Sequence, residues 1–277
     1  MNKLLVRVLT GALFGVVLLG AILYGHTSFG ALFTIVAMLS VNELSNLIHE
    51  YKKTSFSTLH AVLGGGYLFV AFYCITHLGI ENHTLLFAPY AFLVAYTFVR
   101  QLYNKEGSSL DNYAYFTLTQ LYAAIPFALL NILSTVGAEG STYNFAMPLS
   151  IFVFIWCNDT GAFFVGCSMG RHKMWERVSP KKTWEGTIGG VVVAMIAGYV
   201  MSLFFTTLNV WQWIGLATVV SIAGTYGDLI ESCMKREMGI KDSGNILPGH
   251  GGFLDRFDST LLAAPVAMIY LALIGVL

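Results

Sequence analysis

Long apolar stretches separated by short polar segments dominate the pattern of positions along this chain. Strict alternation of apolar and polar positions, which marks the strands of a membrane barrel, is missing from these stretches, so the pattern predicts helices. Each stretch is close to the roughly 20 residues that a helix needs to cross a bilayer. We therefore expect an all-α polytopic membrane protein with about nine transmembrane helices. The nine stretches are residues 6–25, 28–48, 57–77, 84–102, 114–136, 146–169, 186–208, 211–233 and 259–277.

The composition agrees with a membrane protein. Hydrophobic residues make up 56% of the 277 residues and charged residues only 11%, whereas a soluble domain carries about 25% charged residues. An ordinary soluble enzyme and a disordered chain are therefore both excluded. Lys plus Arg and Asp plus Glu are equal at 15 each, so no nucleic-acid partner is expected. The four cysteines form no C-x-x-C pair and are expected to behave as small apolar residues in helices.

The cations predict the orientation of the chain. Every Lys and Arg lies near the N-terminus or after the second, fourth, sixth or eighth apolar stretch. With nine spans these segments all face one side, and the opposite loops carry only Glu81 and Glu139 as charged residues. The positive-inside rule then places the N-terminus in the cytoplasm and the C-terminus outside. We expect one integral domain over 1–277, in which 1–140 is less informative and 146–277 carries the charged motifs.

Four acidic residues lie at apparent membrane depth, where an ionisable group is a candidate functional residue. Glu43 fits either a hydrogen bond between helices or a position at the lip of a site. Asp159, near the middle of the sixth stretch, fits either a functional role or a polar clamp between helices. The other two are Asp228 and Glu231.

Asp228, Glu231, Ser232 and Lys235 follow the spacing i, i+3, i+4 and i+7, which places them on one face of a helix. A lipid environment would penalise such a stripe, so we expect it to line a hydrated cavity at the cytoplasmic end of the eighth span. The alternative is a buried ladder of salt bridges between helices.

A glycine-rich, charged segment follows this stripe, from Lys241 to Asp258. Its glycines allow the backbone to approach a ligand closely, and Asp255 and Asp258 are spaced for one face of a helix start. Carboxylates with few His or Cys neighbours prefer hard cations such as Mg²⁺ or Ca²⁺, and the Lys and Arg nearby suit phosphate. These features indicate metal-assisted phosphoryl-group chemistry. A solvated turn near anionic lipid headgroups is the alternative.

The segment resembles the signature of the phosphatidate cytidylyltransferase (CDP-diacylglycerol synthase) family at residues 232–236, 241–242 and 250–258. A second region, 158–162 with 179–186, is also similar to this family. The resemblance implies that CTP and phosphatidate react to give CDP-diacylglycerol and pyrophosphate for phospholipid biosynthesis. It also implies a requirement for Mg²⁺, with two cations per site as an option, a homodimer, and a bacterial inner-membrane location with the active site facing the cytoplasm.

Carried over to the matching positions, the resemblance makes Asp228 and Asp255 the best metal ligands, with Glu231 and Asp258 as further candidates. The other catalytic candidates are Lys235, Arg236, His250 and Arg256, with His250 expected to contact phosphate. The candidates for substrate binding are Lys181, Lys182, Ser232, Lys241, Asp159, Gly251 and Gly252. Because the attacking phosphate oxygen of phosphatidate is already anionic, catalysis would rest mainly on positioning and charge neutralisation.

Two other functions fit parts of the pattern. An ion-coupled secondary transporter would use Asp159, Asp228 and Glu231 as ion sites, although no inverted repeat is evident and the charges gather at one face. A lipid phosphotransferase or nucleotidyltransferase that acts on another lipid is a closer alternative.

Overall fold

The computed structural model describes residues 3–104, 108–138, 143–244 and 251–277. The chain divides into two compact units. The first unit comprises Met1–Ile132 and Asp242–Arg256, and the second comprises Leu133–Lys241 and Phe257–Leu277. Each unit is described by itself, and the single domain expected over 1–277 stays a prediction.

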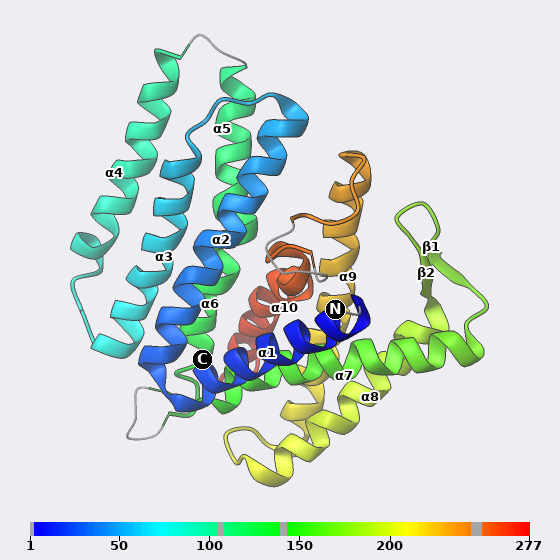
Figure 1. Cartoon of the computed structure of the whole chain (residues 1–277). Helices are drawn as coiled ribbons and strands as arrows, with labels where there is room; N and C mark the ends of the chain where they lie inside the picture. The colour runs from blue at the N-terminus through cyan, green and yellow to red at the C-terminus, as the bar shows by residue number, and fades with distance from the viewer. Residues whose placement is uncertain (1–2, 105–107, 139–142, 245–250) are drawn as a thin grey trace. The chain divides into compact units, whose positions relative to one another are not determined.

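Helices make up the first unit. Figure 1 shows α2, α3, α4 and α5 side by side within it, and α1 contacts α2. The last helical segment is continuous but changes from α-helix to π-helix and back, from α5 through η1 to α6. The bounds are α1 Lys3–Tyr24, α2 His26–Lys52, α3 Thr58–Leu78, α4 His83–Leu102, α5 Ser109–Leu118, η1 Thr119–Ala124 and α6 Ile125–Leu133.

Small residues bring α2 and α3 together. A Cβ atom on Gly65 would lie 2.9 Å from Val41, and one on Gly66 would lie 2.7 Å from Met38. The helices therefore approach closely only because α3 has no side chains at these two positions, a common arrangement in membrane helices. The core beside this contact includes Phe29 and Phe69, which are completely buried.

The second unit contains four long helices and one β-hairpin. Its elements are α7 Ala146–Met169, β1 Lys173–Trp175, β2 Ser179–Thr183, α8 Trp184–Phe204, α9 Val210–Glu237 and α10 Leu254–Leu273, whose first turn belongs to the first unit. Figure 1 shows α7 and α8 packed along each other. Gly186 and Gly190 permit this contact, since Cβ atoms there would lie 2.9 Å from Ala162 O and 2.6 Å from Asn158 O.

The prediction of an all-α polytopic membrane protein is confirmed. In the described parts of the chain, eight helical segments are long and apolar enough to cross a membrane, and α1 adds a shorter apolar stretch, Val8–Tyr24. The expectation did not include the antiparallel hairpin of β1 and β2, which lies in the segment between the sixth and seventh apolar stretches. The predicted orientation of the termini stays a prediction.

Candidate active site

The polar stripe on α9 divides into two pairs. Asp228 Oδ2 lies 2.7 Å from Lys182 Nζ, and Ser232 Oγ donates a hydrogen bond of 3.1 Å to Asp228 Oδ1. Glu231 Oε1 lies 3.0 Å from Lys235 Nζ, one helical turn along. The side chain of Asp228 is 32% exposed, whereas that of Glu231 is 1% exposed.

These two pairs match different expectations. Asp228 is accessible, as a residue that binds a substrate or a cation must be. Glu231 is instead buried against Lys235, so its placement in a hydrated cavity is corrected: it forms a buried ion pair. This pair lies within α9 and not between helices, because residues four apart face each other on a helix.

Two further carboxylates of the second unit interact electrostatically with Asp228. The charge of Asp228 lies within electrostatic range of Asp159 on α7 and of Asp258 on α10. The close approach of α9 and α10 depends on Gly227, where a Cβ atom would lie 2.7 Å from Asp258 O. Three helices thus bring three acidic residues together, with Lys182 and Lys235 as the neighbouring cations. We call these five residues the carboxylate–lysine cluster.

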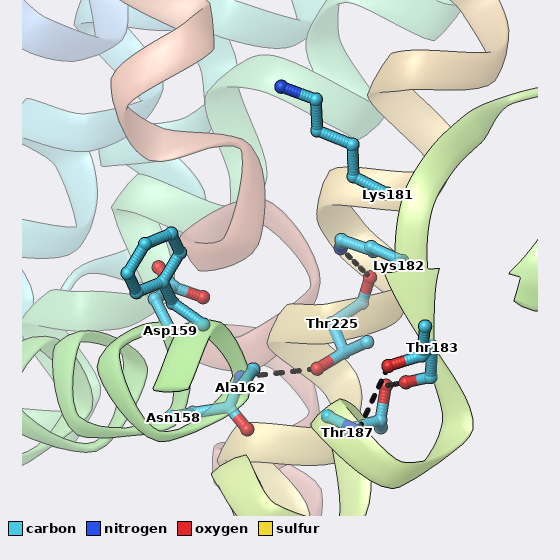
Figure 2. A pocket seen from close by; sticks show the side chains of 10 residues that line it. Asn158, Asp159, Ala162, Lys181, Lys182, Thr183, Thr187 and Thr225 are labelled. Atoms are coloured by element: carbon cyan, nitrogen blue, oxygen red, sulfur yellow. Dashed lines mark hydrogen bonds between the residues drawn. The ribbon is translucent and has the colours of Figure 1, made fainter. Parts of the chain in front are cut away.

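A cavity of about 200 Å³ adjoins this cluster (Figure 2). Asn158 and Asp159 line it from α7, Lys181 and Lys182 from β2, and Thr225 from α9. Figure 2 shows the hydrogen bonds that Thr225 receives, at 3.2 Å from Asn158 Nδ2 to its hydroxyl and at 3.2 Å from Lys182 Nζ to its carbonyl oxygen. The predicted substrate-binding residues Asp159, Lys181 and Lys182 therefore share one cavity.

The hairpin fixes the position of the two lysines. Its register pairs Lys173 with Thr183 and Trp175 with Ser179. The Thr183 hydroxyl then accepts a hydrogen bond of 3.2 Å from Gly186 N and caps α8. Lys182 is thus held between a strand pair and a helix cap, which aims a flexible side chain at Asp228 and Thr225.

The glycine-rich segment is organised by two buried carboxylates of the first unit. Asp255 Oδ2 accepts hydrogen bonds from Ser243 N at 2.8 Å and Gly252 N at 2.9 Å. Glu43 accepts hydrogen bonds from Phe253 N at 2.9 Å and Leu254 N at 3.3 Å. It also accepts one from the Ser243 hydroxyl. Because these partners lie at the start of α10, the negative charge of Glu43 also suits the helix N-terminus.

The same contacts explain two glycines that were expected to bind substrate. Gly251 has a φ of +83°, which favours glycine. A Cβ atom on Gly252 would overlap the Glu43 carboxylate. In the described structure these glycines let the segment pack against Asp255 and Glu43, and their predicted contact with substrate stays a prediction.

The remaining candidates are exposed or are not described. Arg236 is exposed and donates a hydrogen bond of 2.9 Å to Ile240 O, and Lys241 and Arg256 are also exposed. His250 lies outside the described residues. Asp228 and Asp255 belong to different compact units, so their joint binding of a metal stays a prediction.

Thr225 is the main residue of the cavity that the sequence interpretation missed. It lies three positions before Asp228, so it continues the stripe of α9 by one turn. Extending the i, i+3 pattern toward the N-terminus would have included it. Asn158 was part of a motif but was not assigned a role, and it anchors the α7 wall of the cavity to Thr225.

Comparisons with known proteins cover almost the whole chain. Residues 5–274 match the model of the Cytidylyltransferase family. The phosphatidate cytidylyltransferase of Bacillus subtilis (strain 168) is 33% identical over 273 residues, covering 96% of this chain and 97% of the relative. That of Staphylococcus aureus (strain COL) is 33% identical over 267 residues, covering 96% and 98%. That of Staphylococcus epidermidis is 38% identical over 183 residues, covering 65% and 68%.

Proposed function

The chain belongs to the cytidylyltransferase family, and we propose that it carries out its transfer at the carboxylate–lysine cluster. Its reaction joins the cytidylyl group of CTP to phosphatidate and gives CDP-diacylglycerol and pyrophosphate, a step of phospholipid biosynthesis. The observation that supports this location is the 2.7 Å pair of Asp228 and Lys182, beside the cavity that Asp159 and Lys182 line. In this pair the Asp228 carboxylate can bind a metal cation, and the Lys182 ammonium group beside it can bind a phosphate.

The reaction needs positioning more than proton transfer. A phosphate oxygen of phosphatidate attacks the α-phosphorus of CTP and forms the new P–O bond, while the bond from that phosphorus to the pyrophosphate oxygen breaks. The attacking oxygen is anionic at neutral pH, so no strong general base is required. The main obstacle is the repulsion between two highly charged anions, which fixed cations and dipoles reduce.

Lys182 is the residue best placed to reduce this repulsion. Its ammonium group lies between Asp228 Oδ2 at 2.7 Å and Thr225 O at 3.2 Å, and its side chain is 25% exposed. A lysine has three donors on a flexible stem, so Lys182 can turn one of them toward a phosphate in the adjoining cavity. Lys181 lines the same cavity and provides a second cation.

The cluster also suits Mg²⁺, which would neutralise and orient the phosphate oxygens. Asp228, Asp159 and Asp258 supply only oxygen donors, as a hard cation prefers. Within the described ranges no three His, Cys, Asp or Glu side chains form a ready metal-binding group. Mg²⁺ usually binds through one or two carboxylates and completes its shell with substrate phosphates and water, and the cluster fits this mode. We propose Asp228 as the main ligand, with Asp255 as the second ligand implied by the signature.

The membrane setting follows from the two substrates. The apolar helices identify an integral membrane protein, and the named relatives are bacterial. We propose the inner membrane with the site facing the cytoplasm, because CTP is soluble and phosphatidate is held in the bilayer. The restriction of every Lys and Arg to the N-terminus and to the segments after alternate spans supports this orientation. A homodimer, implied by the family resemblance, is part of the same proposal.

The decisive experiment measures the reaction with the purified full chain. Radiolabelled CTP is incubated with phosphatidate in detergent, and CDP-diacylglycerol is separated by chromatography. Labelled lipid that requires phosphatidate, CTP and Mg²⁺ together supports the proposal. Labelled product from a prenyl phosphate but not from phosphatidate would show that the lipid substrate is a different one. Ion flux in proteoliposomes without any labelled product would overturn it in favour of a transporter.

A further inference from the structure

A second cavity, of about 430 Å³, lies in the first unit at the C-terminal end of α4. The segment that joins α2 to α3 forms its other wall. Ser55 and Ser57 line it from that segment, and Arg100, Gln101 and Asn104 line it from the end of α4. None of these residues belongs to the carboxylate–lysine cluster, which lies entirely in the second unit.

Two hydrogen-bond donors line this cavity, Gln101 and Arg100. Gln101 is only 6% exposed, and its buried Nε2 atom has no hydrogen-bond partner among the described residues. Arg100 is exposed at the cavity and forms no ion pair with the part of the chain that the structure describes. Buried donors without acceptors are rare because they lose their bonds to water. The amide of Gln101 is therefore available to donate a hydrogen bond to a group of a bound ligand.

The wall around these donors is held firmly. Asn104 Nδ2 donates to Ser55 Oγ at 2.9 Å, and Asn112 Nδ2 donates to the same hydroxyl at 3.1 Å. The side-chain oxygen Oδ1 of Asn112 accepts a hydrogen bond of 2.8 Å from Ser55 N. This network joins α4, α5 and the α2–α3 connection, so the cavity does not depend on one mobile side chain.

The charges of the cavity favour an anion. The described residues of its lining provide one guanidinium group and several amide and hydroxyl groups, and none of them is a carboxylate. Lys52 and Lys53 directly precede the connection that forms its wall. A guanidinium group with neighbouring amide donors matches the geometry of phosphate oxygens. The ligand class is therefore a phosphate group.

The surface beside the cavity indicates that this phosphate belongs to a lipid. α4 is apolar enough to cross a membrane, and only 11% of the residues in its most apolar 18-residue stretch are buried. Val99 and Leu102 near the cavity are 52% and 72% exposed. We propose that the cavity binds the phosphate of an anionic phospholipid through Arg100 and Gln101, with the acyl chains lying along α4. This is a lipid-binding site separate from the proposed active site.

Phosphatidylglycerol is the suitable probe, because it carries a phosphate but is not the substrate proposed for the active site. The purified full chain in an uncharged detergent is titrated with phosphatidylglycerol, and bound lipid is counted by native mass spectrometry. Arg100→Gln removes the charge, and Gln101→Glu replaces the amide by a group that repels phosphate. Each variant is expected to bind the lipid about tenfold more weakly or worse, the equivalent of about 1.4 kcal/mol.

Arg177→Gln is the matched control, since Arg177 is an exposed cation on the hairpin segment. It is expected to bind phosphatidylglycerol like the unaltered chain, and all variants should keep their cytidylyltransferase activity. Unchanged binding in both Arg100→Gln and Gln101→Glu would overturn the proposal. Equally strong binding of phosphatidylcholine would show that the anionic charge is not recognised. Full displacement by millimolar inorganic phosphate would assign the cavity to a soluble anion instead of a lipid.

Discussion

Two sets of acidic residues, one in each compact unit, use their carboxylates in opposite ways. In the second unit Asp228 faces a lysine and two other carboxylates, and it is 32% exposed. In the first unit Glu43 and Asp255 are 5% and 9% exposed, and they accept hydrogen bonds from backbone N–H groups and a hydroxyl. A carboxylate paired with a flexible lysine can exchange that partner for a ligand. A carboxylate that accepts several backbone hydrogen bonds fixes the shape of a loop.

The largest effect is expected in the second unit, where Asp228 can exchange its lysine partner for a ligand. Asp228→Asn keeps the size of the side chain but removes the charge that attracts a cation and pairs with Lys182. We expect CDP-diacylglycerol formation to fall by about 10²–10³, the range for loss of one charge-stabilising group. The thermal midpoint of the purified protein should change little, because Asp228 is partly exposed. The assay is product formation at saturating Mg²⁺.

Asp111→Asn is the control for this variant, since Asp111 is an exposed aspartate in the first turn of α5. It should keep activity close to that of the unaltered chain. Turnover of Asp228→Asn within a factor of three of the unaltered chain would show that the cluster is not the site of transfer.

Asp255→Asn tests whether one residue serves in both sets. The asparagine keeps a carbonyl oxygen that can accept the hydrogen bonds from Ser243 N and Gly252 N. The loop should therefore keep its shape, while a metal ligand would lose its charge. If Asp255 binds Mg²⁺ with Asp228, we expect activity to fall by about 10² and the concentration of Mg²⁺ needed for half-maximal activity to rise. Normal activity with a normal Mg²⁺ requirement would show that Asp255 shapes the loop and does not bind the metal.

Glu43→Gln tests whether the buried carboxylates of the first unit fix the shape of the loop. Glutamine has one acceptor oxygen in place of two, and its amide group would face N–H donors of Phe253 or Leu254. A buried donor without an acceptor costs about 1–3 kcal/mol, so the thermal midpoint should fall. Glu50→Gln, at an exposed position of the same helix, is the control and should leave the midpoint unchanged. An unchanged midpoint for Glu43→Gln would show that the loop is held by Asp255 alone.

Much of the fold was predictable because the bilayer imposes simple rules. A span must be helical and long, so the apolar stretches identified the helices that the structure contains. The hairpin of β1 and β2 was not predicted, since strands of three and five residues are too short to show a period of two. The segment is also bonded to a residue outside it, since Glu185 in the first turn of α8 accepts hydrogen bonds from Arg171 N and His172 N.

The candidate site was predictable only where its residues share one helix. The spacing of Asp228 and Ser232 placed them correctly on one face of α9. The partner of Asp228 is Lys182, which lies 46 positions earlier, and no local pattern relates the two. Glu43 and Ser243 are separated by 200 positions. Both contacts follow from tertiary packing, and this is why the sequence indicated the chemistry of Asp228 but left the role of Glu43 open.

Gly252→Ala is the smallest change to the chain and tests the same loop from the opposite side. The new methyl group would overlap the Glu43 carboxylate, so either the loop or the start of α10 must shift. We expect a loss of stability of about 1–3 kcal/mol, the usual cost of overpacking. Gly20→Ala is the control, because nothing lies within 4 Å of its added Cβ atom. The shorter side chain in Glu43→Asp should relieve part of the loss in the double variant, which a double-mutant cycle measures. Additive losses would mean that Gly252 and Glu43 act independently, and the loop would then owe its shape to Asp255 and to the positive φ of Gly251.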